Sequence, residues 1–382
     1  MAPAPNPTMA TDAPKLQHIA LSASRTAQHR ALAIQSLDPA QSGSGGDVLE
    51  YDMEKTPPFD EASPGLPVLT ITLNPAVDLA TSTPDVRPGP KLRCTPPLID
   101  PGGGGVNVAR TIGRLGGRTQ ALVVTGGVTG DQLLALLEAE GINTIPVRVA
   151  GETRQNFAVT DSATGAQYRF GLPGAELGDN DITAVLDTIA ANTVQGGIVV
   201  LSGSLAPGLD TGFPQQINGL VTQAGARFAV DTSGAALAEL IAYPTTPLYL
   251  LRIDQNEARQ AANSRLTHVR DSIYFAQSLV ARGVAEMIVT GRGPEGSILV
   301  TRDEHCFCTA PEVRVNSKIG AGDAFVGALV LSLSRGLSPA EALRRGVAAS
   351  GATVTTQGTA LCSLEDVERL LRQCRLQEPP AR

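Results

Sequence analysis

The sequence predicts an α/β fold in three layers, with a mostly parallel central sheet and a small β-sheet lid. Strand-like and helix-like runs alternate from residue 68 onward, which is the pattern of parallel strands joined by covering helices. Glycine is abundant, at 40 of 382 residues, and aromatic residues make up only 3%, as expected of aliphatic strands linked by many short turns. Two strand-rich interruptions of the alternation predict the lid. With 42% hydrophobic residues, the chain can build one large domain and a smaller attachment.

The strands of the main sheet are predicted from short aliphatic runs that lack helical spacing. They lie at residues 68–73, 121–124, 198–201, 228–230, 248–253 and 287–290. Helices are expected between them. Residues 131–140 carry leucines on one face and end at Gly141. Ser338-Pro339-Ala340-Glu341 has the form of a capping box with proline at the first helical position, so a helix begins there.

The two interruptions lie at about residues 79–100 and 154–172. The first contains Pro and Thr but has no helical period. The second is typical of a hairpin, because residues 157–159 and 168–170 flank the turn-forming run at 161–165. We expect the two segments to pair into a small separate sheet over the ligand-binding edge of the main domain.

Composition excludes several function classes. The net charge of −7 argues against general binding to nucleic acid or a membrane surface, and no apolar run approaches the ~20 residues of a membrane span. The five cysteines, at positions 94, 306, 308, 362 and 374, form no CxxC pair. Cys306 and Cys308 beside His305 suggest a metal site, but no second cluster completes it. Reduced, mostly buried thiols are expected, which favours a cytoplasmic protein.

The chain ends differ from its centre. Residues 1–66 are rich in Ala, Pro, Ser and Gln without sustained periodicity, which predicts a disordered N-terminal extension. A transit peptide is an alternative that two acidic residues weaken, and Met53 is an alternative start. The folded domain is expected over residues 67–376, followed by a short tail at 377–382.

The most informative motif is Gly320-Ala321-Gly322-Asp323, which opens a buried helix. Two glycines let backbone N–H groups approach an anion where the helix dipole favours negative charge. A carboxylate in such a turn suits phosphoryl transfer, in which it takes the proton of the attacking hydroxyl. The alternative is that Asp323 only caps the helix. These four residues alone favour neither role.

Two further glycine-rich runs border the predicted strands. Residues 101–105 precede Asn107 and a helix, which allows either close ligand contact or a flexible hinge. The run from Gly291 to Gly296 matches G-x-G-x-x-G, but a strand rather than a helix follows, so a dinucleotide fold is rejected. A Walker A motif is absent from the sequence, which excludes a P-loop NTPase.

Charged residues near the predicted lid suggest a phosphate site. Lys91 and Arg93 share one face if their segment is a strand, and Arg154 lies at the base of the hairpin. Solvated surface charges are the alternative for each of them. Asp78 follows the first strand, at the sheet edge where open α/β folds bind ligands, and suits sugar hydroxyls.

These residues together resemble the ribokinase-like (PfkB) carbohydrate kinases over residues 68–373. The resemblance rests on two signatures, Gly102–Gly117 and Ser317–Val330. It also rests on narrower stretches typical of the branch that phosphorylates fructose 6-phosphate, at residues 89–95, 153–156, 167–170 and 357–359. It implies a ribokinase-like fold and a phosphotransferase acting in glycolysis. ATP would phosphorylate O1 of fructose 6-phosphate.

The resemblance also implies roles for individual residues. Asp323 would be the general base, and Gly320, Ala321 and Gly322 the anion hole. Sugar-phosphate ligands would be Asp78, Lys91, Arg93, Gly103, Gly104, Asn107, Arg154 and Ser204. Nucleotide ligands would be Arg252, Asp254, Glu257, Gly291, Gly293, Gly296 and Gly358. Mg²⁺ would lie near Asp254 and Glu257, and K⁺ at carbonyls near Ser317 and Ile319. Members of this kind form homodimers through the lid sheet.

The chain departs from that pattern on the nucleotide side. Asp254 stands where the family has a neutral amide, so it either binds Mg²⁺ or weakens nucleotide binding by repulsion. Gly291 stands where a hydroxyl residue is common, and Thr356 and Ala360 replace Asn and Arg of the resembled branch. Two rival functions therefore remain. One is a kinase of fructose 1-phosphate or tagatose 6-phosphate, and the other is a non-catalytic sugar-phosphate sensor.

Overall fold

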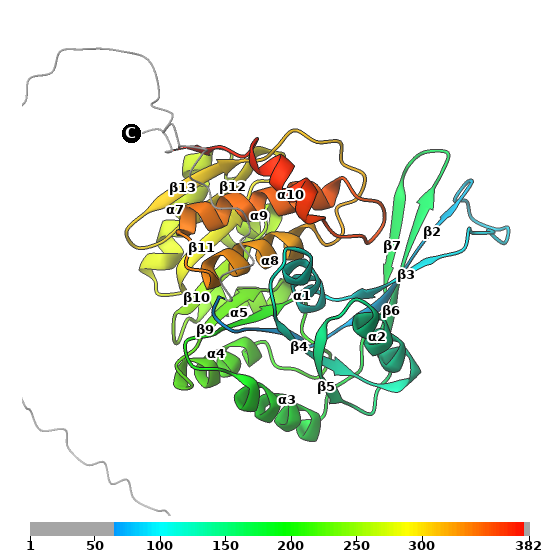
Figure 1. Cartoon of the computed structure of the whole chain (residues 1–382), viewed down its shortest axis with the longest axis horizontal. Helices are drawn as coiled ribbons and strands as arrows, with labels where there is room; N and C mark the ends of the chain where they lie inside the picture. The colour runs from blue at the N-terminus through cyan, green and yellow to red at the C-terminus, as the bar shows by residue number, and fades with distance from the viewer. Residues whose placement is uncertain (1–64, 378–382) are drawn as a thin grey trace, which may run out of the picture. The chain divides into compact units, whose positions relative to one another are not determined.

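The computed structural model describes residues 65–377, which form a ten-stranded sheet between two layers of helices and a separate four-stranded sheet (Figure 1). The large sheet has the order β14-β13-β12-β11-β10-β9-β8-β1-β4-β5. It is parallel from β11 to β5 and antiparallel from β11 to β14. Its strands are β1 (Val68–Thr72), β4 (Gln120–Thr125), β5 (Asn143–Arg148), β8 (Ile198–Ser202), β9 (Arg227–Asp231), β10 (Leu248–Ile253), β11 (Ala285–Gly291), β12 (Gly296–Val300), β13 (His305–Thr309) and β14 (Leu376–Gln377). All six predicted strands are confirmed.

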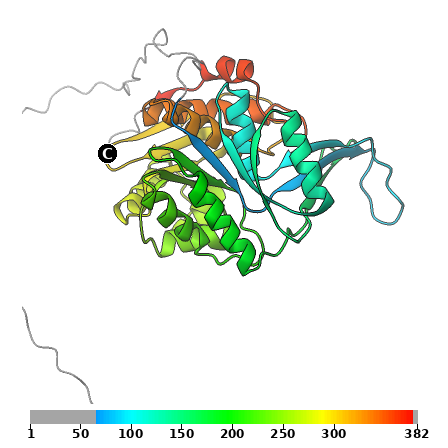
Figure 2. The ribbon, with the colours of Figure 1, turned by 60° about the horizontal axis from the view of Figure 1, so that its bottom comes forward.

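Helices cover both faces of this sheet (Figures 1 and 2). One face carries α1 (Gly104–Arg114), α2 (Gly127–Ala139), α8 (Ala321–Ser334), α9 (Pro339–Val354) and α10 (Leu364–Leu371). The other face carries α3 (Asp179–Asn192), α4 (Phe213–Gln223), α5 (Gly234–Ala242), α6 (Gln255–Ala262) and α7 (Val269–Ala281). The predicted three-layer α/β architecture is therefore confirmed.

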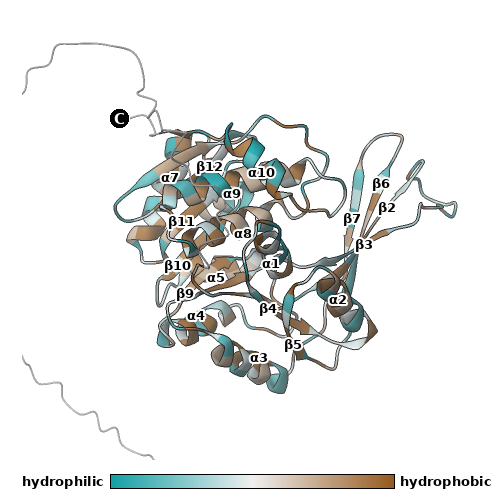
Figure 3. Ribbon diagram, in the orientation of Figure 1, coloured by the Kyte–Doolittle hydropathy of each residue, from teal (hydrophilic) through white to brown (hydrophobic). Residues whose placement is uncertain are grey.

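The aliphatic strands are buried on both sides, which explains why they show no polar alternation. In β8, Val199 and Leu201 pack into one hydrophobic cluster, whereas Ile198 and Val200 pack into the cluster on the opposite face. The hydropathy colouring shows the same continuous apolar character along the central strands (Figure 3). This burial fixes the strand ends, and with them the residues that follow each strand.

The small sheet has the order β3-β2-β6-β7 and combines two distant segments of the chain. Its strands are β2 (Ala76–Thr83), β3 (Leu98–Gly102), β6 (Arg154–Asp161) and β7 (Gln167–Gly171). β2 pairs in parallel with β6, so Asp78 lies opposite Asn156, and β6 and β7 form the expected hairpin. Figure 2 shows this sheet extending from one edge of the main sheet, with the β2–β3 loop at its far end.

Helix starts and chain ends also bear on the predictions. Ser338 caps α9 by accepting the N–H of Glu341, whereas the Glu341 side chain pairs with Arg344 and Arg345 of the same helix.

At the C-terminal end, β14 includes Gln377, the first residue of the expected tail, because it pairs with β13. The alternatives for residues 1–64 and for 378–382 lie outside the described residues. No helix within residues 65–377 is long and apolar enough to cross a membrane.

Candidate active site

Asp323 lies in the first turn of α8 and does not cap it. The N-cap is Gly320, whose φ of 72° is in the left-handed region that favours glycine, and no side chain bonds to the cap. The Asp323 carboxylate instead accepts hydrogen bonds from two other elements. Asn107 Nδ2 of α1 donates to Oδ2 at 3.0 Å, and Ser202 Oγ at the end of β8 donates to Oδ1 at 3.3 Å. The capping role is therefore wrong, and the carboxylate is held by Asn107 and Ser202 instead.

Electrostatics around Asp323 favour a proton acceptor that titrates near neutrality. Burial and the neighbouring Asp231 carboxylate raise the pKa of Asp323 to about 6, against the opposing effects of Asn107, Arg252 and Ser202. Asp231 ends β9 and accepts a hydrogen bond from Arg252 Nη1 at 3.0 Å. A carboxylate with such a pKa accepts a proton more readily than an ordinary aspartate, while remaining mostly ionised above pH 7.

The glycine-rich run before α1 is closely packed against the main sheet. A Cβ on Gly104 would lie 2.5 Å from the Gly203 nitrogen, and one on Gly105 would lie 2.3 Å from the Ile71 carbonyl oxygen. Gly103 has a φ of 114°, which is open to glycine but rarely to other residues. The run therefore brings α1 close to the ends of β1 and β8, and it is not a loose hinge.

A cavity of about 340 Å³ lies between the small sheet and the main domain. Its polar lining includes Asp78, Arg154, Asn156, Arg169 and Thr359. Asn156 Nδ2 donates to Asp78 Oδ1 at 2.8 Å, and burial raises the pKa of Asp78 although Asn156, Arg154 and Arg169 oppose the rise. The cavity thus combines a hydrogen-bond acceptor with two guanidinium groups, which suits a phosphorylated sugar.

Arg154 is held at one side of this cavity. Its guanidinium donates to the Asn74 carbonyl at 3.0 and 3.3 Å and to the Leu172 carbonyl at 3.3 Å. Asn74 Nδ2 in turn donates to Ser204 Oγ at 3.2 Å, so the predicted pair of Arg154 and Ser204 is brought together. The sequence analysis did not name Arg169 as a ligand. The signal that could have identified it is the alternation of side chains along β7, which places every second one on the cavity face.

Lys91 and Arg93 do not lie on a strand. Residues 84–97 form an irregular loop between β2 and β3, and both side chains are exposed and line neither of the two cavities described here. The strand prediction failed because prolines 84, 88, 90, 96 and 97 remove backbone donors from the segment. Their shared face is therefore a wrong prediction, and their phosphate role stays a proposal.

A second cavity, of about 100 Å³, borders Arg252 and the turn between β11 and β12. It is lined by Arg252, Val289, Gly291, Gly293, Gly296, Ser297, Phe325 and Ser350. β11 and β12 are antiparallel, which confirms that this glycine-rich run is a hairpin and not a dinucleotide fold. A Cβ on Gly322 would lie 3.0 Å from Arg252 Nη1, so the guanidinium lies directly beside the start of α8.

Asp254 and Glu257 form a capping box at the start of α6. Asp254 Oδ1 accepts the N–H groups of Asn256 and Glu257 at 2.7 and 2.8 Å, and Glu257 Oε2 accepts the Asp254 N–H at 2.8 Å. One oxygen of each carboxylate therefore accepts the hydrogen bonds of the cap, and the other oxygen of each is available to a cation. Within the described part of the chain, no group of three or more His, Cys, Asp or Glu residues could hold a metal ion.

Ser317, Ile319 and Gly358 lie together near the lid. Ser317 Oγ donates to the Gly358 carbonyl at 2.7 Å and accepts the Ile319 N–H at 3.2 Å. A Cβ on Gly358 would contact Ala80 of β2 at 3.4 Å, and Gly358 does not line the cavity beside Arg252. Ile319 lines the cavity under the lid. This position favours a structural role for Gly358 at the lid rather than a nucleotide contact.

Known proteins are similar to this chain over most of its length. The chain matches the family described as pfkB family carbohydrate kinase over residues 66–366. ATP-dependent 6-phosphofructokinase isozyme 2 of Escherichia coli (strain K12) is 39% identical over 303 residues, which are 79% of this chain and 97% of that protein. The protein of the same name from Mycobacterium tuberculosis (strain ATCC 25618 / H37Rv) is also 39% identical, over 81% of this chain and 90% of that one.

A solved structure has the same fold. The crystal structure of phosphofructokinase-2 from Escherichia coli in complex with substrates and products has a TM-score of 0.76 and 38% identity, and covers 81% of this chain and 99% of that one. The same Escherichia coli protein has also been solved in complex with potassium and as a tetrameric inhibited form, with TM-scores of 0.76 and 0.75. The match over most of the chain, together with a half-buried Asp323 beside a glycine-rich helix start, shows that this protein belongs to the pfkB family of carbohydrate kinases.

Proposed function

We propose that this protein transfers the γ-phosphoryl group of ATP to O1 of fructose 6-phosphate, giving fructose 1,6-bisphosphate. The observation that carries the proposal is the placement of Asp323. Its carboxylate has a pKa raised to about 6 and is held between Asn107 and Ser202 at the start of α8. The relatives named 6-phosphofructokinase support fructose 6-phosphate as the acceptor.

Asp323 takes the proton of the sugar hydroxyl as that oxygen attacks phosphorus. The N–H groups of Gly320, Ala321 and Gly322 then face the oxygens that gain charge, because the first turn of a helix leaves its donors without helical partners. Of the three, the Ala321 N–H makes only a long bond of 3.5 Å, to the Lys318 carbonyl. Arg252, beside Gly322, adds a positive charge at the same place. Positioning and charge neutralisation are what phosphoryl transfer requires of a protein.

The sugar phosphate is proposed to fill the cavity under the lid. Asp78, supported by Asn156, accepts hydrogen bonds from sugar hydroxyls, and Gly103, Gly104 and Asn107 complete that side. Arg154 and Arg169 hold the 6-phosphate, and Ser204 lies within the same network through Asn74. Lys91 and Arg93 remain weaker candidates, since the loop that carries them leaves their side chains exposed.

ATP is proposed to bind beside Arg252 and the Gly291–Gly296 hairpin. Mg²⁺, when bound to the triphosphate, neutralises charge on the phosphate oxygens. Mg²⁺ usually keeps several waters and takes one or two carboxylates, so the uncommitted oxygens of Asp254 and Glu257 fit it. A K⁺ site at carbonyls near Ser317 and Ile319 draws support from the potassium complex of the relative. A cytoplasmic, glycolytic kinase is the setting that these substrates imply.

A homodimer through the lid is proposed from the face of the small sheet opposite Asp78. By strand alternation, Ile99, Phe157, Tyr168 and Phe170 share that face, and each is 36% or more exposed. An apolar row of this kind on a free sheet favours burial against a second copy.

A coupled assay with ATP and a panel of phosphosugars tests the proposal. We expect the highest kcat/KM with fructose 6-phosphate. A higher kcat/KM with fructose 1-phosphate or tagatose 6-phosphate would reassign the acceptor within the family. Binding of a phosphosugar without turnover of any would identify a sensor and overturn the kinase assignment.

A further inference from the structure

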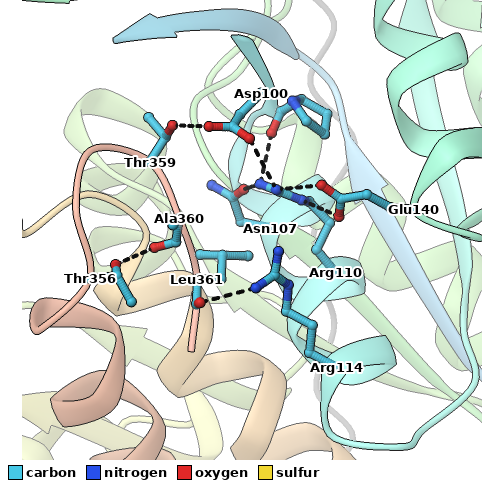
Figure 4. A network of polar contacts seen from close by, with 10 residues as sticks. Asp100, Asn107, Arg110, Arg114, Glu140, Thr356, Thr359, Ala360 and Leu361 are labelled. Carbon is cyan, nitrogen blue, oxygen red and sulfur yellow. Dashed lines mark hydrogen bonds and ion pairs between the residues drawn. The ribbon is translucent and has the colours of Figure 1, made fainter. Parts of the chain in front are cut away.

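Arg110 is the largest buried cation next to the proposed active site. It lies in α1, one turn after Asn107, and its side chain is 1% exposed. Its guanidinium forms a two-bond pair with Glu140, from Nε at 2.8 Å and from Nη2 at 2.6 Å. Nη1 donates to the Pro101 carbonyl at 3.1 Å and to Asn107 Oδ1 at 3.2 Å (Figure 4). No sequence motif singled it out.

The contacts of Asn107 fix which way its amide faces. Asn107 is itself buried, and its side chain joins Arg110 on one side to Asp323 on the other. A guanidinium can only donate and a carboxylate can only accept, so one amide orientation satisfies both partners. In that orientation Oδ1 faces Arg110 and Nδ2 faces Asp323. The reverse orientation would place an amide N–H₂ against a guanidinium and an oxygen against a carboxylate.

We propose that Arg110 is a positioning residue of the active site, which holds the Asn107 amide so that it donates to the carboxylate of Asp323. The inference rests on the proposed role of Asp323 as the base. The charged groups that face Asp323 directly are Asp231 of β9 and Arg252 of β10, whereas Arg110 acts on it through Asn107.

The same guanidinium also anchors the sugar side of the site. Besides the Pro101 carbonyl, its Nη2 lies 3.7 Å from Asp100 Oδ1, and Thr359 Oγ1 donates to the other oxygen of Asp100 (Figure 4). Asp100 and Pro101 belong to β3, whose last residue, Gly102, lies against the Asp78 carboxylate. Arg110 therefore bonds both to Asn107, which contacts Asp323, and to β3, which lies against Asp78. It links the position of the proposed base to that of a proposed sugar-binding residue.

The alternative is that the Arg110–Glu140 ion pair only stabilises the fold. A matched control distinguishes the two, because Arg345 of α9 is also 1% exposed and pairs with Glu341 at 3.2 Å. Both Arg110→Met and Arg345→Met remove a buried guanidinium from a glutamate. Only the first removes a hydrogen bond to Asn107.

The experiment measures the pH dependence of kcat/KM for wild type, Arg110→Met, Arg345→Met, Asn107→Ala and the Arg110→Met, Asn107→Ala double variant. We expect Arg110→Met to lower kcat about tenfold or more. We also expect its acid limb to move about 1 pH unit upward, because the charged form of Asp323 loses a hydrogen bond. In the Asn107→Ala background, Arg110→Met should add little. An unmoved acid limb, or a full additional loss in that background, would overturn the proposal.

Two further variants keep the test decisive if Arg110→Met does not fold. Glu140→Gln retains Arg110 but loosens it, and should shift the acid limb in the same direction by a smaller amount. Arg110→Lys keeps a cationic donor for Asn107 Oδ1 but not the two-bond pair with Glu140, so it should retain an acid limb close to that of wild type; an acid limb as far shifted as in Glu140→Gln would contradict the proposal. Wild-type turnover in the same assays tests the kinase function separately, so the failure of one claim does not conceal the other.

Discussion

Asp323 and Asp231 share the hydroxyl of one serine, because Ser202 Oγ lies 3.3 Å from a carboxylate oxygen of the first and 3.4 Å from one of the second. A hydroxyl carries one proton, so it can donate to only one carboxylate at a time. When Asp323 is protonated it can donate to Ser202, which is then free to donate to Asp231. This arrangement agrees with a raised pKa for Asp323 and with Asp231 as a cause of the rise.

Replacing Asp323 by Asn should lower kcat by at least roughly 10²-fold, the low end for loss of a general base. The variant should fold normally. Because the pKa of Asp323 is about 6 in the folded chain against 3.8 ordinarily, this group lowers the free energy of unfolding as pH rises from about 3.8 to about 6, and the loss stays constant above that range. At pH 7, Asp323→Asn should therefore unfold at the same or a higher temperature than wild type. Near-normal turnover would remove Asp323 from the mechanism.

Asp231→Asn should move the acid limb of kcat/KM to lower pH. Wild-type activity should fall below about pH 6 as Asp323 gains a proton. Removing the Asp231 carboxylate eliminates a repulsion that raises the Asp323 pKa, and it leaves the Arg252 charge unneutralised nearby. A pH-rate profile for both proteins checks this. An upward shift would mean that Asp231 acts on Asp323 by a route other than charge.

Arg154→Met and Arg169→Met should each raise KM for the phosphosugar about tenfold or more, since a charge-assisted hydrogen bond to phosphate is lost. KM for ATP should change little, because both side chains line the cavity under the lid. Arg87→Met is the control, as that exposed side chain pairs with Asp85 on the β2–β3 loop. An equal effect of all three variants would indicate a general charge effect.

Asp254→Asn should leave the melting temperature nearly unchanged but raise KM for MgATP severalfold, because Asn keeps the helix cap and loses the carboxylate oxygen proposed for Mg²⁺. Asn caps helices as well as Asp does, and Oδ1 of Asp254 is already committed to α6. Asp254→Ala should lose about 1 kcal/mol of unfolding free energy with the cap. An unchanged KM for MgATP in Asp254→Asn would exclude the free oxygen of Asp254 from the proposed Mg²⁺ site.

Phe170→Asp should shift the protein toward a monomer in size-exclusion chromatography with light scattering. Phe170 is 55% exposed on the apolar face of the lid, where a carboxylate would oppose burial against a second copy. Tyr243→Asp, which alters another exposed aromatic residue far from the lid in sequence, should leave the oligomeric state unchanged. A Phe170→Asp variant that elutes as wild type would exclude this face as the interface.

The fold and the centre of the site were predictable because they depend on local patterns. Aliphatic runs gave the strands, and the turn before Asp323 placed a carboxylate at a helix start. The partners of that carboxylate were not predictable in the same way. Ser202 and Asp231 are single residues at strand ends 29 positions apart, and only the parallel register of β8 and β9 brings them together. Arg110 is one buried arginine whose contacts lie on its own helix and on two other segments of the chain.

The prediction that Lys91 and Arg93 share one face of a strand was wrong because it relied on a local pattern that does not apply to this segment. It applied strand alternation to residues 84–97 without testing whether their backbone could pair, although five prolines argued against pairing. The sequence also left the role of Asp323 open, because the same four residues can precede an aspartate that caps a helix or one that acts as a base. The left-handed backbone at Gly320 and the bonds from Asn107 and Ser202 are tertiary facts that separate the two.

The small sheet has a mechanical consequence. Its two segments enter and leave the main domain separately, at residues 73–75, 103, 149–153 and 172–178, so four covalent tethers attach one end of it. Motion of the sheet relative to the main domain therefore requires all four tethers to bend together. Each such motion carries Asp78, Asn156 and Arg169 together, because they lie on paired strands. The rates of substrate entry and product exit should therefore depend on the stiffness of the four tethers. Substitutions in these tethers are the ones expected to change the rate of product release.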